Sequence, residues 1–196
     1  MSGSRVELAD LSLSRFLAWE ERQELRYERL GGVVRAMAGG SLRHDRIAGN
    51  LRVFLHPHLR RRGCDDFGSD VKVASPRGDV TYPDLSVRCG PYDPNATTIE
   101  DPVLVVEVLS PSTAQRDLTL KRQAYESIPS LRVILYVWQD QPRIDVVRRG
   151  ADGRWDDDEP AVGADATLAL PELGIEIPLA AVYEGVSFEE AEGGPA

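Results

Sequence analysis

Residues 103–109 read VLVVEVL, and six of these seven side chains are aliphatic. A short run of Val and Leu that is apolar on both faces is typical of a strand in the middle of a sheet. Glu107 is the exception, because a buried carboxylate costs free energy unless a cation or several hydrogen-bond donors meet it. The run therefore predicts a sheet with a buried central strand, in which Glu107 has a partner.

The length and charge of the chain limit the classes of protein to consider. Its 196 residues predict one domain over 1–187, followed by an acidic tail of small residues at 188–196. The formal net charge of -9 argues against a protein that coats nucleic acid through unspecific electrostatics. It does not exclude an enzyme that binds a divalent metal ion at carboxylates, because the ion changes the local sign of the charge.

The cysteines and the N-terminus indicate the compartment. Cys64 and Cys89 have neither CxxC nor metal-ligand spacing, so we expect them to be reduced, as in an intracellular protein. The start MSGSRVELADLS lacks a basic region followed by an apolar one, and no apolar run approaches the length needed to cross a bilayer. We therefore expect a cytoplasmic protein without a membrane partner.

The order of predicted elements is that of a mixed α/β fold. Gly31 and Gly32 suit the positive φ angles of a tight hairpin. Pro57 either kinks the second of three predicted helices or ends it early. The predicted helices cover 13–23 after a Ser12 cap, 41–63, and 111–128 with Ser112 or Thr113 as cap. The predicted strands flank the two glycines and then cover 69–75, 80–90, 103–110, 132–140 and 143–149.

Two carboxylates lie on strands that we expect to be neighbours. Strand alternation puts Glu107 on the face of Val105 and Leu109, and Asp84 follows Pro83 in the preceding strand. If the strands pair, the two carboxylates converge, and such a pair is stable around a divalent cation. The alternative is that Asp84 caps a turn and Glu107 pairs with an arginine.

Lys121 is the candidate cation in the helix that follows. Leu118, Lys121 and Tyr125 are spaced i, i+3, i+7, so the lysine can point back at the sheet. The alternative is an i, i+4 pair of Asp117 with Lys121 on a solvated face.

Basic residues of the predicted second helix form another candidate feature. Their charges predict either a local patch that faces phosphates or a solvated helix face. These residues are Arg43, Arg46, Arg52 and the three arginines at 60–62.

Three motifs in this order carry a family resemblance. YPD at 82–84, VLVVEVLSPST at 103–113 and the D…KRQAY pattern at 117–125 resemble the Uma-type family of restriction-endonuclease-like proteins. That family is part of the PD-(D/E)XK nuclease superfamily, and the segments 26–51 and 170–184 resemble it as well. The resemblance implies a restriction-endonuclease-like core: a central mixed sheet flanked by helices, here with an N-terminal helix and a β-hairpin.

The resemblance also implies a metal-dependent site for phosphodiester cleavage. It makes Asp84 and Glu107 the two motif carboxylates. The standard motif has a lysine two residues after the glutamate, where this chain has Leu109. The family pattern moves that lysine to the following helix, which here is Lys121.

Two further residues match the family. Glu28 matches the early acidic residue, so the implied ligands of Mg²⁺ or Mn²⁺ are Asp84, Glu107 and Glu28. His44 matches a histidine at the start of the next helix, so it joins the implied catalytic set. The alternatives are an exposed hairpin glutamate for Glu28 and a buried structural histidine for His44.

The sequence thus predicts an Mg²⁺- or Mn²⁺-dependent endonuclease, a hydrolase that cleaves phosphodiester bonds of nucleic acid, with DNA as the first candidate. One alternative is a catalytically inactive module of nuclease fold that binds nucleic acid or a protein partner. Another is a metal-dependent hydrolase that acts on a smaller phosphate ester. The oligomeric state stays open, with a homodimer as one option.

Overall fold

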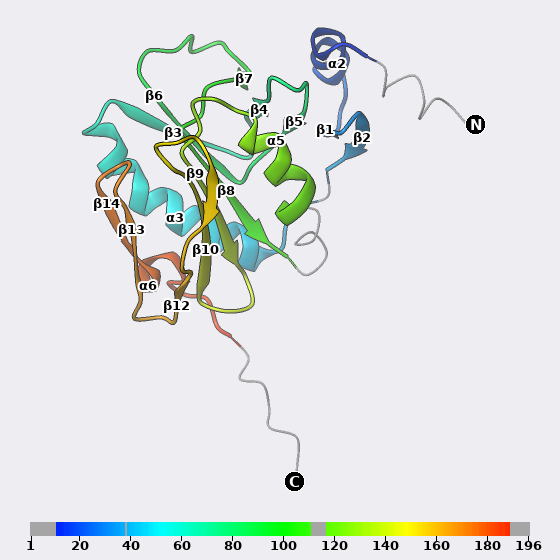
Figure 1. Cartoon of the computed structure of the whole chain (residues 1–196). Coiled ribbons are helices and arrows are strands. Elements are labelled where there is room, and N and C mark those ends of the chain that lie inside the picture. The colour runs from blue at the N-terminus through cyan, green and yellow to red at the C-terminus, as the bar shows by residue number, and fades with distance from the viewer. Residues whose placement is uncertain (1–10, 38, 111–116, 189–196) are drawn as a thin grey trace.

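The structure is a computed structural model, and it describes residues 11–37, 39–110 and 117–188 (Figure 1). The helix caps predicted at Ser112 and Thr113 lie outside these residues, and so does the predicted acidic tail from residue 189 onward.

The larger sheet is mixed and has the predicted strand near its centre. The strand order is β11-β10-β9-β8-β6-β3, and β12 pairs with β10. All six residues of β8 are buried; β8 pairs in parallel with β9 and antiparallel with β6. The strands are β3 (Cys64–Gly68), β6 (Leu85–Cys89), β8 (Leu104–Leu109), β9 (Val133–Trp138), β10 (Arg143–Arg149), β11 (Trp155–Asp157) and β12 (Ala161–Val162). The predicted fold class is confirmed.

The two faces of β8 belong to separate hydrophobic cores. Leu104, Val106 and Val108 pack in the core that contains the apolar stripe of α3 (Leu42–Arg60). The hairpin of β13 (Thr167–Leu170) and β14 (Ile175–Pro178) and the helix α6 (Leu179–Val182) complete that side (Figure 1).

On the opposite face, Val105 and Leu109 pack against Tyr125 of α5 (Arg122–Glu126). The strand alternation predicted for this run is therefore confirmed. Glu107 lies on the α5 face, which is the face that carries the site.

A smaller sheet with the order β2-β1-β5-β4-β7 holds the N-terminal part of the chain. Ser12 caps α2 (Leu13–Glu20), and Gly31 and Gly32 take φ angles of 55° and 78° in the hairpin turn, as predicted. Phe16 of α2 packs on Ala74 and Val80 of this sheet. Its strands are β1 (Tyr27–Leu30), β2 (Val33–Ala36), β4 (Lys72–Ala74), β5 (Val80–Thr81) and β7 (Thr98–Ile99).

The segment 80–90 differs from the single strand predicted for it. It divides into β5, which belongs to the smaller sheet, and β6, which belongs to the larger one. Asp84 therefore precedes β6 rather than lying inside a strand. Residues 82–84 connect the two sheets. The pattern of apolar residues along the chain gives no sign that the chain passes from one sheet to the other at this point.

Pro57 lies inside α3 and does not end it, since the helix continues to Arg60.

The prediction of reduced cysteines is wrong in this structure: Cys64 and Cys89 lie opposite each other in the β3–β6 register and form a disulfide. Their spacing in the sequence did not reveal this pair because antiparallel pairing joins them across 25 residues.

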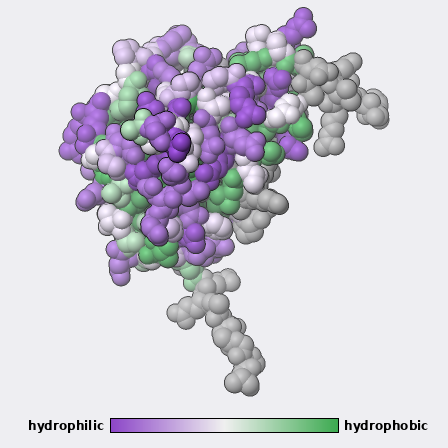
Figure 2. Space-filling view, viewed as in Figure 1, coloured by the Kyte–Doolittle hydropathy of each residue, from purple (hydrophilic) through white to green (hydrophobic). Residues whose placement is uncertain are grey.

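No helix in the described ranges is long and apolar enough to cross a membrane. Hydrophilic residues prevail on the face seen in Figure 2.

Candidate active site

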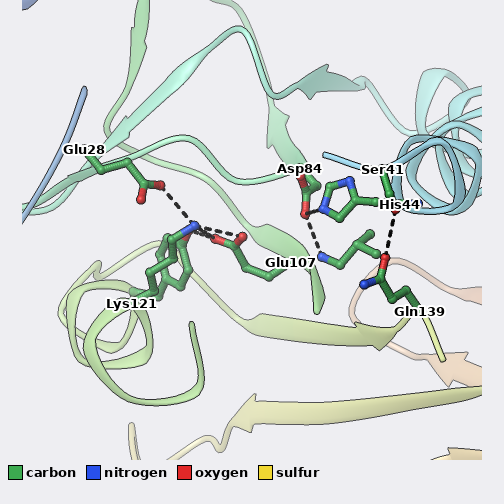
Figure 3. A network of polar contacts seen from close by, with 9 residues as sticks. Glu28, Ser41, His44, Asp84, Glu107, Lys121 and Gln139 are labelled. Carbon is green, nitrogen blue, oxygen red and sulfur yellow. Dashed lines mark hydrogen bonds and ion pairs between the residues drawn. The ribbon is translucent and has the colours of Figure 1, made fainter. Parts of the chain in front are cut away.

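Lys121 holds two buried carboxylates together (Figure 3). Its Nζ lies 3.0 Å from both carboxylate oxygens of Glu107 on β8 and 3.0 Å from Oε1 of Glu28 on β1. Each of the three side chains is 4% exposed. The solvated-face alternative for Lys121 is therefore wrong, as is the exposed-hairpin alternative for Glu28.

The local backbone directs Lys121 to the sheet. It ends a π-helical turn, η1 (Asp117–Lys121), which leads directly into α5. Such widened turns are frequent at functional sites because they alter which side chains face inward. Here the turn belongs to the segment packed over the face of β8 that carries Glu107.

Tyr125 is a site residue that the sequence pattern marked only as apolar packing. It is fully buried, and its hydroxyl donates a hydrogen bond to Oε1 of Glu107. Burial raises the pKa of Tyr125 well above its ordinary value, and the charge of Glu107 raises it further. The phenol therefore stays a neutral donor. Its i+4 position relative to Lys121 is the signal that could have identified it.

Asp84 directly precedes the neighbouring strand, β6, and takes part in a separate set of contacts (Figure 3). Leu85 faces Val106 in the β6–β8 register, which sets Asp84 opposite Glu107. Oδ2 of Asp84 accepts a hydrogen bond of 2.7 Å from the backbone N–H of Val108, and it lies 3.2 Å from Nε2 of His44. The predicted adjacency of the two carboxylate strands is confirmed.

His44 is positioned by the start of α3. Ser41 caps the helix by accepting a hydrogen bond of 3.2 Å from the His44 N–H, and its hydroxyl lies 3.3 Å from Oε1 of Gln139. The hydrogen bond to Asp84 raises the pKa of His44, and this effect outweighs the opposite effect of burial. The cap and the ion pair together hold the imidazole against Asp84.

A metal ion suits the chemistry of these donors, although the carboxylates are not gathered around one point. Hard cations such as Mg²⁺ and Mn²⁺ prefer carboxylate oxygens. Oδ1 of Asp84 has no hydrogen-bond partner among the described residues, and the side chain is 15% exposed. Within the same ranges, no three His, Cys, Asp or Glu side chains are arranged to hold a metal ion.

Part of the predicted basic patch is neutralised. Arg52 forms an ion pair of 2.6 Å with Asp66, and Arg60 pairs with Asp65, both on β3. His56 also contacts Asp66, at 2.5 Å. These side chains join α3 to the edge strand of the larger sheet, so their charges are not free for a phosphate backbone.

The mixed sheet and its layers define a restriction-endonuclease-like fold. A crystal structure of a putative nuclease belonging to DUF820 from Anabaena variabilis superposes on this chain with a TM-score of 0.72. The match covers 88% of this chain and 97% of that one at 18% identity, so it establishes the fold alone.

The model of the Uma2 family, described as putative restriction endonuclease, matches residues 13–180, and the chain belongs to this family. The family resemblance drawn from the motifs is confirmed. Two relatives come from Synechocystis. The uncharacterized protein slr1290 is 36% identical over 91% of this chain and 94% of its own length. The uncharacterized protein sll1609 is 28% identical over 74% of this chain and 84% of its own length.

Proposed function

We propose that this chain is a nuclease that hydrolyses phosphodiester bonds of DNA with the help of Mg²⁺ or Mn²⁺. One observation carries the proposal: a buried ammonium, that of Lys121, lies between two buried carboxylates, and a third carboxylate, that of Asp84, directly precedes the adjoining strand. Buried charges of this kind are expensive and concentrate at functional sites. Membership of a family of putative restriction endonucleases supports the same reading.

The proposed metal ligands are Asp84, Glu107 and Glu28, because oxygen donors of this charge suit a hard cation. When bound, the cation supplies a Lewis acid and lowers the pKa of a coordinated water. Oδ1 of Asp84, which accepts no hydrogen bond from the described residues, is available to the cation, while Glu107 is oriented by hydrogen bonds from Lys121 and Tyr125.

Lys121 has two proposed roles. Its ammonium neutralises negative charge that develops on the scissile phosphate, and it orients the attacking water by hydrogen bonding. A lysine suits this position because its compact charge can donate to three acceptors. His44 holds Asp84 in place through its imidazole.

A cleavage assay tests the proposal. Supercoiled plasmid, linear duplex, single-stranded DNA and RNA are incubated with the protein in Mg²⁺, in Mn²⁺ and in EDTA. We expect metal-dependent cleavage of DNA that Asp84→Asn abolishes. Asp156→Asn is the matched control, because Asp156 is an exposed residue of β11. Cleavage in EDTA, or equal cleavage by Asp84→Asn and wild type, would contradict the proposal.

Two observations favour a second candidate, a module of nuclease fold that binds without cleaving. Both oxygens of Glu107 already accept hydrogen bonds from Lys121, and no three-residue metal group exists among the described residues. For this candidate, the same nucleic acids bind in a gel-shift assay while none is cleaved in any metal.

A further inference from the structure

The use of lysine in this chain is unusual. Of its 23 basic Lys and Arg residues only two are lysines, Lys72 and Lys121. Both lysine side chains are buried, and each contacts a buried glutamate. Lys121 belongs to the proposed active site, whereas Lys72 lies in the smaller sheet and has no role in the chemistry proposed above.

Lys72 belongs to a second buried polar cluster. Its Nζ lies 2.8 Å from Oε2 of Glu20, the last residue of α2. The hydroxyl of Tyr82 donates a hydrogen bond of 2.5 Å to the other oxygen, Oε1, which also accepts one of 3.3 Å from the N–H of Tyr27. We call Glu20, Lys72 and Tyr82 the anchor cluster. All three residues are 4% exposed.

The protonation states within the anchor cluster are well defined. Burial raises the pKa of Glu20, but the hydrogen bonds from Lys72 and Tyr82 and the charge of Lys72 lower it more, so the net shift is downward. Burial and the hydrogen bond to Glu20 raise the pKa of Tyr82. Glu20 is therefore a carboxylate and Tyr82 a neutral donor, so the hydrogen bond between them is charge-assisted.

Tyr82 joins this cluster to the proposed site. While its hydroxyl contacts Glu20, its backbone N–H donates a hydrogen bond of 3.1 Å to Oε1 of Glu28. The same oxygen of Glu28 lies 3.0 Å from Nζ of Lys121. One residue thus contacts both buried ion pairs, one through its side chain and the other through its backbone.

The backbone around Tyr82 is stiff, so a displacement of Tyr82 also displaces the residues next to it. Pro83 fixes its own φ angle and biases Tyr82 toward extended backbone, so residues 82–84 are a stiff bridge from β5 to β6. The next residue is Asp84. A shift of the Tyr82 ring would therefore move the backbone that carries both the donor to Glu28 and the Asp84 carboxylate.

We propose that the anchor cluster is a positioning unit for the active site: it sets the place of Glu28 and Asp84 through Tyr82, and so makes α2 part of the catalytic apparatus. Tyr82, Glu20 and Lys72 are positioning residues, since none of them touches the reacting atoms in this scheme. The proposal rests on the proposed nuclease function for its catalytic consequence, but the physical link to Lys121 can be measured without any activity.

The test compares Tyr82→Phe with wild type. The variant keeps the ring and removes only the hydroxyl. Tyr92→Phe is the matched control, because Tyr92 is an exposed tyrosine whose ring packs on Phe67. Lysine labelled with carbon-13 at Cε yields signals from only two side chains in untagged protein, and Lys72→Arg identifies which of them is Lys121.

We expect Tyr82→Phe to move the Lys121 signal and to weaken Mn²⁺ binding and kcat by about tenfold or more, with the KM for DNA unchanged. Tyr92→Phe should leave all of these as in wild type. A Lys121 signal that stays in place, or a kcat per folded molecule within about twofold of wild type, would overturn the proposal.

Two further outcomes are informative. If Tyr82→Phe does not fold, Glu20→Gln weakens the same hydrogen bond and is measured in the same way, with the same criteria. If the wild type cleaves no nucleic acid, the proposed nuclease function fails, while a shifted Lys121 signal in Tyr82→Phe still supports the link and an unshifted one refutes it.

Discussion

Replacing Lys121 by Met tests the account of the buried cluster most directly. Met keeps most of the stem volume and removes the ammonium that contacts Glu107 and Glu28. Removing one partner of a buried ion pair costs about 3–5 kcal/mol, because the remaining charge stays buried without it. In a chain of this length 1 kcal/mol corresponds to about 2–4 °C in Tm, so we expect a loss on the order of 10 °C.

A second variant distinguishes charge from packing. Glu107→Gln keeps an acceptor for Lys121 and Tyr125, so it should cost less, about 1–3 kcal/mol. The double variant Lys121→Met with Glu107→Gln should be more stable than Lys121→Met alone, because one of the two carboxylates that lost the ammonium has become neutral. The two substitutions are therefore not additive in the free energy of unfolding, and such coupling is expected for residues in direct contact.

Thermal unfolding followed by circular dichroism in EDTA measures these differences without metal ions. Leu120→Met is the matched control, because it places the same residue at the neighbouring, partly exposed position. A Lys121→Met variant that melted within about 2 °C of wild type would show that the ammonium does not stabilise the two buried carboxylates. A double variant less stable than Lys121→Met would refute the assignment of the effect to charge.

Three further predictions concern other contacts of the site and of α3. Asp84→Ala should abolish Mn²⁺ binding in isothermal titration, and unchanged binding would place the metal elsewhere. Tyr125→Phe should reduce Mn²⁺ affinity about tenfold to a hundredfold, because the hydroxyl orients Glu107; an unchanged titration would count against that role. Burial raises the pKa of Asp66, but hydrogen bonds from Arg52 and His56 lower it more, so the net shift of this pKa is downward. The ionised Asp66 therefore stabilises the folded protein above the pKa of an aspartate in the unfolded chain, about 3.9. This stabilisation is lost as the pH falls through the lower pKa that Asp66 has in the folded protein. Asp66→Asn should therefore lower Tm at neutral pH and progressively less below about pH 4, and a pH-independent difference would contradict this.

Several features of the fold could be predicted because they depend on residues close together in the sequence. The alternation in β8 identified its two faces, and the pair Gly31-Gly32 identified the hairpin turn. Ser12 identified the start of α2. In each case side-chain periodicity, backbone sterics or a local hydrogen bond favours one structure over its alternatives.

The candidate site was predicted residue by residue, but its contacts were not. The motifs named Glu28, Asp84, Glu107, Lys121 and His44, and the structure places all five at adjoining strands and helices (Figure 3). It divides them, however, into a lysine cluster and an aspartate–histidine pair. Which carboxylate meets which cation depends on side chains from β1, β8 and η1, and the spacing along one segment carries no information about the others.

Long-range pairing decided the rest. The register of β3 and β6 brings Cys64 and Cys89 together, and the passage of residues 82–84 from one sheet to the other gives Tyr82 its two contacts. The sequence by itself determined which residues are apolar, charged or conformationally restricted. Only the tertiary structure decided which of them share a buried space, because the free energy of burying a charge depends on partners brought there by other parts of the chain.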